Sequence, residues 1–213
     1  MGARFTIAID GTFASGKGSL ASRLAAHYDL PYLDTGKLYR AVAKRVMDAG
    51  VDPENADACA NHAASLTADE LADPILKSGP IGAMASRVAV HPPVRAALLQ
   101  FQKDFASQGA VLDGRDIGTV ICPDADVKLF VDAEPEERAR RRHAELTGYG
   151  EDITYETVLA QLRERDARDS GREIAPLKPA ENAHLLDTTN LSIERAFEVA
   201  ITMCDAILSA KSV

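Results

Sequence analysis

The chain has 213 residues, of which 46% are apolar and 26% are charged, which is ordinary for one compact domain with a full core. Its formal net charge of -8 argues against general binding to nucleic-acid polymers or anionic membranes, because those partners need a broad basic surface. The three cysteines are far apart and form no CxxC pair, so neither a zinc site nor a disulfide framework is expected.

No apolar run approaches the length that spans a membrane, and the first predicted strand starts almost at the first residue, which leaves no room for a signal peptide. We therefore expect a cytoplasmic protein without a membrane or nucleic-acid partner. We also expect it to be a monomer.

The first predicted element is a strand over residues 5–9, which leads into the segment GTFASGKGS at residues 11–19. This segment fits the GxxxxGK phosphate-binding pattern, and the residues after it have the period of an amphipathic helix. A strand that enters a glycine turn and then a helix points backbone N–H groups inward, where they cradle phosphates, while Lys17 adds a positive charge. A glycine turn without a ligand accounts less well for this setting. The predicted nucleotide contacts are Gly11, Thr12, Phe13, Ala14, Ser15, Gly16, Lys17, Gly18 and Ser19.

The residue after Lys17 is Gly18, where a Mg²⁺-binding Ser or Thr usually stands, and the hydroxyl comes one place later at Ser19. Mg²⁺ would therefore be held mainly by phosphates and water. Asp113, at a predicted strand end, is our candidate for orienting those waters. The alternative for Asp113 is a turn-capping aspartate.

Four further short apolar runs follow along the chain, at residues 31–33, 110–112, 127–131 and 185–186. Segments with helical periodicity lie between them, and strands that alternate with helices predict an α/β fold with a parallel five-stranded sheet covered on both faces. Apolar stripes within residues 94–105 and 193–208 are interpreted as core. Polar residues gather at the ends of three strands, at Asp10, at residues 34–36 and at residues 113–116. Ligands of open α/β sheets bind beyond these ends, so we expect the site there.

Half of the sixteen arginines lie within residues 138–172, where lysine is absent. They are Arg138, Arg140, Arg141, Arg142, Arg163, Arg165, Arg168 and Arg172. Guanidinium groups stay charged and bind phosphate oxygens bidentately, so several converging on one point suit a migrating phosphoryl group. Pairing with glutamates on helix surfaces remains the alternative for any one of them but does not explain the whole set. The arginines around residues 148–150 are therefore interpreted as a mobile lid.

Four longer stretches accompany the phosphate segment: LDTGKLYRA at residues 33–41, SRVAVHPPVRAAL at 86–98, LDGRDIGTVICPDADVKLF at 112–130 and RERDARDSGREIAPL at 163–177. Together they resemble bacterial cytidylate kinases, which belong to the nucleoside monophosphate kinases among P-loop proteins, and the resemblance runs nearly end to end. Adenylate kinases share the loop but are not expected to carry GRD followed by RDSxRxxAPL.

The resemblance implies a P-loop kinase fold and an enzyme of pyrimidine nucleotide metabolism that phosphorylates CMP and dCMP to CDP and dCDP, with ATP as donor and Mg²⁺. It implies that Ser86, Arg95 and Asp116 contact the cytosine ring. Its implied contacts to the rest of the acceptor are Arg40, Arg115 and Arg172 to the phosphate, Asp169 and Arg165 to the ribose, and Thr35 nearby. Its implied catalytic residues are Lys17, Arg115, Arg172 and the two that would close over the ATP phosphates, Arg141 and Arg142.

Structural roles remain open for two of these residues, because Arg95 could cap its helix and Ser86 could be a packing residue. The segment before residue 86 is short, whereas many family members carry extra strands there, and we expect it to be helical or irregular. We predict one domain over residues 1–213, with a core, an acceptor-binding insert and a lid. The core comprises residues 1–48, 92–135 and 173–213, the insert about 49–91 and the lid about 136–172.

Three other functions remain to be weighed against this one. The nearest is a kinase of the same fold that acts on UMP, AMP or a small metabolite. A GTP-hydrolysing switch would require an NKxD guanine motif, which the sequence lacks. A nucleotide-binding regulator without catalysis does not account for Lys17 together with the arginines.

Overall fold

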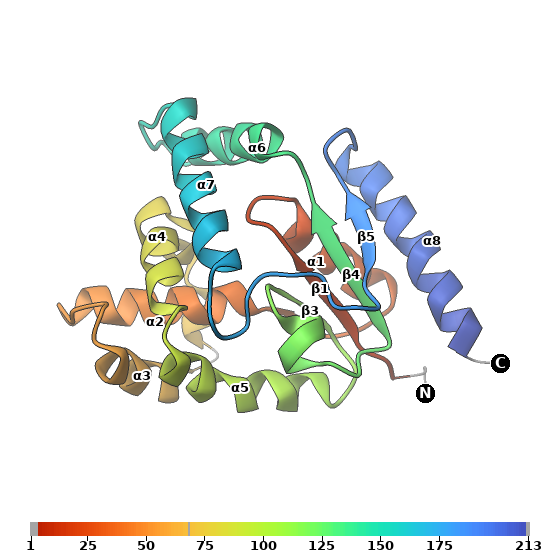
Figure 1. Ribbon diagram of the computed structural model, residues 1–213, viewed down its shortest axis with the longest axis horizontal. Coiled ribbons are helices and arrows are strands. Elements are labelled where there is room, and N and C mark those ends of the chain that lie inside the picture. The colour runs from red at the N-terminus through yellow and green to blue at the C-terminus, as the bar shows by residue number, and fades with distance from the viewer. Residues whose placement is uncertain (1–3, 68, 212–213) are drawn as a thin grey trace.

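The computed structural model describes residues 4–67 and 69–211 and has a parallel five-stranded sheet at its centre, in the order β2-β3-β1-β4-β5 (Figure 1). The strands are β1 Ile7–Gly11, β2 Tyr32–Asp34, β3 Val111–Gly114, β4 Val127–Asp132 and β5 His184–Asp187. Each coincides with or overlaps one of the five apolar runs of the sequence. The predicted α/β class with five parallel strands is confirmed.

The central strand β1 is buried along its whole length. Ile7 stands opposite Val111 of β3 and Val127 of β4, so apolar side chains continue across the sheet. The strand begins two residues later than predicted and continues to Gly11, which pairs with Val131. Near-continuous apolar strands of this kind are typical of parallel sheets that are covered on both faces.

Eight α-helices surround the sheet in the described residues (Figure 1). They are α1 Lys17–His27, α2 Thr35–Asp48, α3 Ala56–Ala64, α4 Gly79–Val88, α5 Pro92–Ala106, α6 Pro135–Gly148, α7 Tyr155–Ser170 and α8 Ile193–Lys211. Helices α1 and α8 pack on one face of the sheet in a cluster that includes Ile9 and Leu24. Helices α2 to α5 pack on the other face, in a cluster that includes Leu112 and Leu98.

The predicted core stripes are correct except at two positions. In α5, Val94 and Leu98 are buried, but Phe101 is 45% exposed because the buried row of the helix continues through Gln102 and Ala106. In α8, Ile193 is 53% exposed at the first residue of the helix. Neither expectation could be corrected from spacing alone, since both residues fit the helical period.

The segment between α2 and α5 is helical, as expected. It contains α3, α4 and two single helical turns, η1 Asp69–Ala72 and η2 Pro74–Lys77, and no strand among the described residues. Helices α6 and α7 form a separate pair beyond the carboxyl end of β4, with their own small apolar cluster around Ala139 and Leu162 (Figure 1). We call α6 and α7 the lid pair. Within the described range, no helix has the length and apolar character needed to cross a membrane.

Candidate active site

The phosphate loop, residues 11–16, joins β1 to α1 at the carboxyl edge of the sheet. Gly11 has a φ of 154°, and a Cβ on it would stand 1.9 Å from the carbonyl oxygen of Val131. Gly16 has a φ of 88° and is the N-cap of α1, where it offers no side chain to the first N–H groups of the helix. These N–H groups and the positive end of the helix dipole are therefore directed at any anion bound in the loop.

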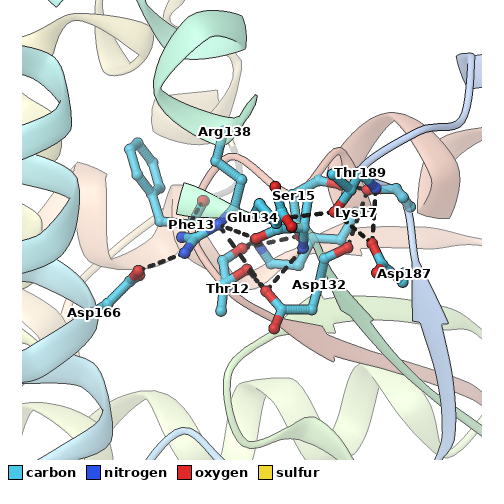
Figure 2. A network of polar contacts seen from close by, with 12 residues as sticks. Thr12, Phe13, Ser15, Lys17, Asp132, Glu134, Arg138, Asp166, Asp187 and Thr189 are labelled. Carbon is cyan, nitrogen blue, oxygen red and sulfur yellow. Dashed lines mark hydrogen bonds and ion pairs between the residues drawn. The ribbon is translucent and has the colours of Figure 1, made fainter. Parts of the chain in front are cut away.

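The loop is fastened to its surroundings on its outer side (Figure 2). The hydroxyl of Thr12 donates to Oδ1 of Asp132 at 2.6 Å, at the end of β4. Buried Arg138 of α6 donates from Nη1 to the carbonyl oxygen of Phe13 at 3.1 Å and from Nη2 to Oδ2 of Asp166 at 2.7 Å. Arg138 thus connects the loop to both helices of the lid pair.

Lys17 and Asp113 interact electrostatically and line the same cavity beside the loop. Lys17 is only 9% exposed, and its Nζ lies 3.5 Å from the carbonyl oxygen of Thr12. Burial lowers the pKa of Lys17, and the nearby charge of Arg115 lowers it further. Burial likewise raises the pKa of Asp113, with a second contribution from Asp34. A phosphate bound against Lys17 would stabilise its protonated form, because it brings the opposite charge.

The neighbourhood of Asp113 suits a hydrated Mg²⁺ ion. Tyr32 donates its hydroxyl to Oδ1 of Asp113 at 3.0 Å, while Oδ2 lies 3.5 Å from the point that a Cβ on residue 18 would occupy. Gly18 therefore leaves this carboxylate open toward the loop, and Asp34 is its partner in the sheet register. The described residues hold no cluster of three or more His, Cys, Asp or Glu side chains able to bind a metal. An ion here would need the oxygens of phosphates and water as further ligands.

A cavity of about 250 Å³ opens beside the phosphate loop, among α2, α4, α5 and α7. We call it the acceptor cavity. It is lined by Lys17, Asp113 and all nine residues predicted to contact the acceptor: Thr35, Arg40, Ser86, Arg95, Arg115, Asp116, Arg165, Asp169 and Arg172. The structure thus brings together residues from five separate segments of the chain.

Asp169 is fully buried at the centre of the basic part of this cavity. Its Oδ2 accepts from Nε of Arg115 at 2.9 Å and lies 3.9 Å from Nε of Arg165, and its Oδ1 accepts from Arg172. Burial raises the pKa of Asp169, but the three guanidinium groups outweigh burial and hold it below its usual value. One carboxylate therefore orients three cations, which leaves net positive charge in the cavity.

Arg40 of α2 adds a fourth cation to the same cavity. Its Nη1 donates to the carbonyl oxygen of Leu76 at 2.6 Å, so η2 supports it from the insert. Burial lowers its pKa, and the neighbouring Arg142 has the same effect. Both causes lower the pKa because it costs free energy to keep a positive charge away from water and close to another cation. A bound anion would offset that cost.

A second set of side chains in the acceptor cavity has hydrogen-bond donors and acceptors that suit a nucleobase. Arg95 of α5 donates to Oδ2 of Asp116, and the two side chains are only 10% and 7% exposed. Arg95 also donates to the carbonyl oxygen of Ala89 at 3.2 Å, so it caps the end of the neighbouring helix α4 and not its own helix α5. The hydroxyl of Ser86 accepts from Arg168 at 2.8 Å and lines the cavity beside them.

A larger cavity of about 510 Å³ adjoins the phosphate loop on its other side. We call it the donor cavity. It is lined by Ser15 and Ser19 of the loop region, by Arg141 and Arg142 of α6, and by the segment after β5 that includes Thr188. Arg141 donates to the carbonyl oxygen of Thr188 at 2.7 Å and to Glu137 at 3.0 Å. Arg142 donates to Glu145 at 2.6 Å.

The eight clustered arginines therefore do not converge on one point. Arg165 and Arg172 line the acceptor cavity, whereas Arg141 and Arg142 line the donor cavity. The remaining four have other places: Arg138 fastens the loop, Arg168 contacts Ser86 and Glu164, and Arg140 and Arg163 are exposed and pair with Glu137 and Glu136. Surface pairing, the alternative for single arginines, describes the last two.

Four further residues belong to the site. Tyr39 and Asp34 line the acceptor cavity, Tyr32 holds Asp113, and Arg168 holds Ser86. Asp34 belongs to the polar strand end at residues 34–36, where the sequence already predicted the site, whereas Tyr39 was not singled out although it lies inside LDTGKLYRA. Nothing in the sequence distinguishes Arg168 from the arginines that only pair on the surface.

Comparisons with known sequences find similar proteins over most of the chain. The sequence model of a protein family described as cytidylate kinase matches residues 7–206. The cytidylate kinase of Xanthobacter autotrophicus is 56% identical over 202 residues, which cover 94% of this chain and 97% of the relative. That of Nitrobacter winogradskyi is 52% identical over 203 residues, which cover 94% and 96%.

Solved structures share the fold at low sequence identity. An uncharacterized protein from Eubacterium ventriosum has a TM-score of 0.57 at 15% identity, covering 95% of this chain and 99% of its own. A gluconokinase from Sinorhizobium meliloti has a TM-score of 0.51 at 16% identity, covering 99% and 98%. These likenesses concern the fold alone and agree with the expected P-loop kinase fold. The family match over nearly the whole length shows that the chain belongs to the cytidylate kinase family.

Proposed function

We propose that this protein transfers the γ-phosphoryl group of ATP to CMP and dCMP, forming CDP and dCDP. The observation that carries the proposal is the acceptor cavity, where arginines grouped on one buried aspartate share a small space with the Arg95–Asp116 pair. The first group suits a phosphate, and the second suits a base with both donor and acceptor atoms. Gly16 and Ser19 line both the acceptor cavity and the donor cavity, so the two nucleotides would meet at the phosphate loop, beside Lys17.

Base selection is assigned to Asp116, Arg95 and Ser86. A carboxylate can accept a hydrogen bond from the exocyclic amine of cytosine, and a guanidinium can donate to its ring nitrogen and carbonyl oxygen. Uracil has a carbonyl where cytosine has the amine, so its oxygen would face Asp116 without a proton between them. This arrangement favours cytosine over uracil.

The rest of the acceptor is assigned to the residues around Asp169. Arg40, Arg115 and Arg172 would hold the phosphate, while Asp169 and Arg165 would contact the ribose. The hydroxyl of Thr35 donates to the backbone carbonyl oxygen of Asp113 at 2.8 Å. Thr35 would therefore hold the end of β3 in place beside the acceptor cavity.

The donor is assigned to residues 11–19, whose backbone N–H groups would bind its phosphates. Arg141 and Arg142 would close over these phosphates from α6. Both now bond to neighbouring carboxylates and carbonyls, so closure exchanges those partners for phosphate oxygens. The lid pair would thereby exclude the water that could otherwise hydrolyse ATP.

The chemistry requires no general base. The second pKa of a phosphate monoester is about 6, so the attacking oxygen is already mostly ionised at neutral pH. Catalysis would come from in-line positioning and from neutralising negative charge through Lys17, the backbone N–H groups and the arginines. Asp113 would hold Mg²⁺ through water, and the metal would supply further charge neutralisation when bound.

The experiment that tests this proposal measures ADP release from ATP with CMP, dCMP, UMP and AMP as separate acceptors. We expect CMP and dCMP to be used at much higher kcat/KM than UMP or AMP. A preference for UMP or AMP would assign the enzyme to another kinase of this fold. Failure to release ADP with any acceptor would favour a nucleotide-binding regulator.

Further proposals concern the whole chain. The acceptor residues come from one chain, so we propose that the monomer is active. Cys59, Cys122 and Cys204 are free thiols, which supports our proposal of a reducing cytoplasmic location. We also propose that the acceptor insert, about residues 49–91, and the lid region, about residues 136–172, move relative to the core.

A further inference from the structure

The side chain of Phe13 lies on an unexpected side of the phosphate loop. Among the described residues, it lines the acceptor cavity and not the donor cavity. Its ring packs against the small apolar cluster of the lid pair, which contains Ala139, Leu146, Val158 and Leu162. A residue in the middle of the donor-binding loop therefore has its side chain among the elements that surround the acceptor.

The ring of Phe13 also faces a guanidinium group of the acceptor cavity. The Cζ atom of Arg165 lies 4.0 Å from the centroid of the ring, which is close for a cation–π contact. Arg142 of the donor side lies near the same ring, with its Cζ 5.6 Å from the centroid. Phe13 thus stands between one arginine of each cavity.

Arg165 has few other partners to hold it. It donates from Nη1 to the carbonyl oxygen of Gly82 at 3.3 Å, and its Nε is buried without a hydrogen-bond partner in the described parts of the chain. Its contact with Asp169 is 3.9 Å long, and Asp169 already binds Arg115 and Arg172. Burial lowers the pKa of Arg165 to about 9, with Arg115 as the next cause, so its charged form is poorly compensated. The negative face of the Phe13 ring lies against this charge and stabilises it.

The backbone of Phe13 is fixed as firmly as its ring. Its carbonyl oxygen accepts from buried Arg138, and the next residue, Ala14, has a φ of 61°, a left-handed conformation that is strained for alanine. Donor phosphates would bind the N–H groups of this same stretch. Any adjustment of the loop on donor binding must therefore move the ring against Arg165.

We propose that Phe13 is a positioning residue that sets the guanidinium of Arg165 in the acceptor cavity and transmits donor binding to the acceptor side. The inference rests on the proposed function, because it requires two nucleotides in the two cavities. Binding of the donor shifts the loop, the loop carries the ring with it, and the ring repositions Arg165. Each substrate consequently strengthens the binding of the other by the same factor.

The test measures the dissociation constant of CMP by calorimetry, without and with a saturating non-hydrolysable ATP analogue and Mg²⁺. The ratio of the two constants reports the linkage, and we expect at least fivefold for the wild type. Phe13→Leu keeps an apolar side chain but removes the ring face. We expect it to bind CMP about fivefold to thirtyfold more weakly in the presence of the analogue, with a ratio close to one. Phe13→Tyr, which keeps the ring, should retain the wild-type ratio.

Val158→Ala is the matched control, because it removes volume from the same apolar cluster and leaves the ring in place. It should keep the wild-type ratio. A full ratio in Phe13→Leu, a ratio of one in the wild type, or a loss of linkage in Val158→Ala equal to that in Phe13→Leu would each overturn the proposal. Failure of the proposed function is seen separately, because the wild type would then fail to phosphorylate CMP in the acceptor assay.

Discussion

Lys17 is the residue whose loss should lower turnover most. Its charge would meet the donor phosphates during transfer, and among the described residues the only hydrogen bond of its side chain is the long one to the carbonyl oxygen of Thr12. We expect Lys17→Ala to lower kcat by about 100-fold or more, because a preorganised charge at the reacting group is lost. Coupled ADP-release kinetics would measure this, with thermal unfolding as the check that the fold is kept. A kcat within a few-fold of the wild type would contradict the assigned role.

Asp116 should control the choice between cytosine and uracil. We expect Asp116→Ala to reduce the ratio of kcat/KM for CMP over UMP by about tenfold to 100-fold, since a hydrogen bond to a charged group is worth roughly 1.5–3 kcal/mol. The matched control is Asp124→Ala, which makes the same change at an exposed position after the same strand. An unchanged preference in Asp116→Ala would remove Asp116 from base recognition.

For individual side chains, the sequence identified those that lie inside distinctive motifs. Asp116 and Arg172 are in such motifs, and the structure places both in the acceptor cavity. The burial and the orientation of a side chain could not be predicted from the sequence, because they depend on contacts between distant segments. Phe13 shows this best, since its position in the loop suggested a donor contact while its ring packs on the lid pair.

Among the elements, α6 depends on Arg138 for its attachment to the phosphate loop. Arg138 is buried, and Asp166, its partner, already has a buried Oδ1 without a hydrogen bond among the described residues. We expect Arg138→Met to lower the free energy of unfolding by about 3 kcal/mol, because it leaves the half-buried carboxylate of Asp166 without its counter-charge and the carbonyl oxygens of Ala133 and Phe13 without their donor. Urea denaturation would measure the loss.

Arg140→Met provides the control for this prediction on the same helix. Arg140 is 66% exposed and pairs only with Glu137 in the described structure, so its removal should change the free energy of unfolding by about 0.5 kcal/mol or less. Equal losses in the two variants would show that α6 is not fastened through Arg138.

Element types and order followed from the sequence because apolar runs and helical periods directly reflect burial. The lid illustrates the limit of this approach. Arginine density predicted one converging cluster, but α6 and α7 direct their arginines to two cavities and to the solvent. Which residues face which cavity depends on the rotation of each helix about its axis, and the lid pair has too small an apolar cluster to reveal that rotation in the sequence.

For the molecule as a whole, Asp10 should impose an unusual dependence of stability on pH. Burial raises its pKa to about 6, although the backbone N–H groups of Gly118 and Ile117 lower it. In the unfolded chain the same carboxyl titrates near 4, so between pH 4 and pH 6 the folded state binds the proton more tightly. Its contribution to stability is therefore fully present below about pH 4 and is lost as the pH rises to about 6.

This difference between the pKa of Asp10 in the folded and the unfolded chain corresponds to about 3 kcal/mol of unfolding free energy. We expect the unfolding free energy of Asp10→Asn, measured relative to the wild type, to rise by about 2–3 kcal/mol between pH 4 and pH 7. Any constant effect of the substitution on packing shifts the curve without changing this difference. Parallel curves for the two proteins, obtained by urea denaturation at each pH, would contradict the buried carboxyl as the cause.

The chain is acidic overall, yet its acceptor cavity concentrates positive charge around Asp169. This local positive charge determines which inhibitors can bind in the cavity. A neutral nucleoside analogue entering the cavity would cover those guanidinium groups without matching their charge, and the desolvation would oppose its affinity. Compounds aimed at this enzyme should therefore carry a phosphonate or similar dianion, or be delivered as prodrugs that become monophosphates inside the cell.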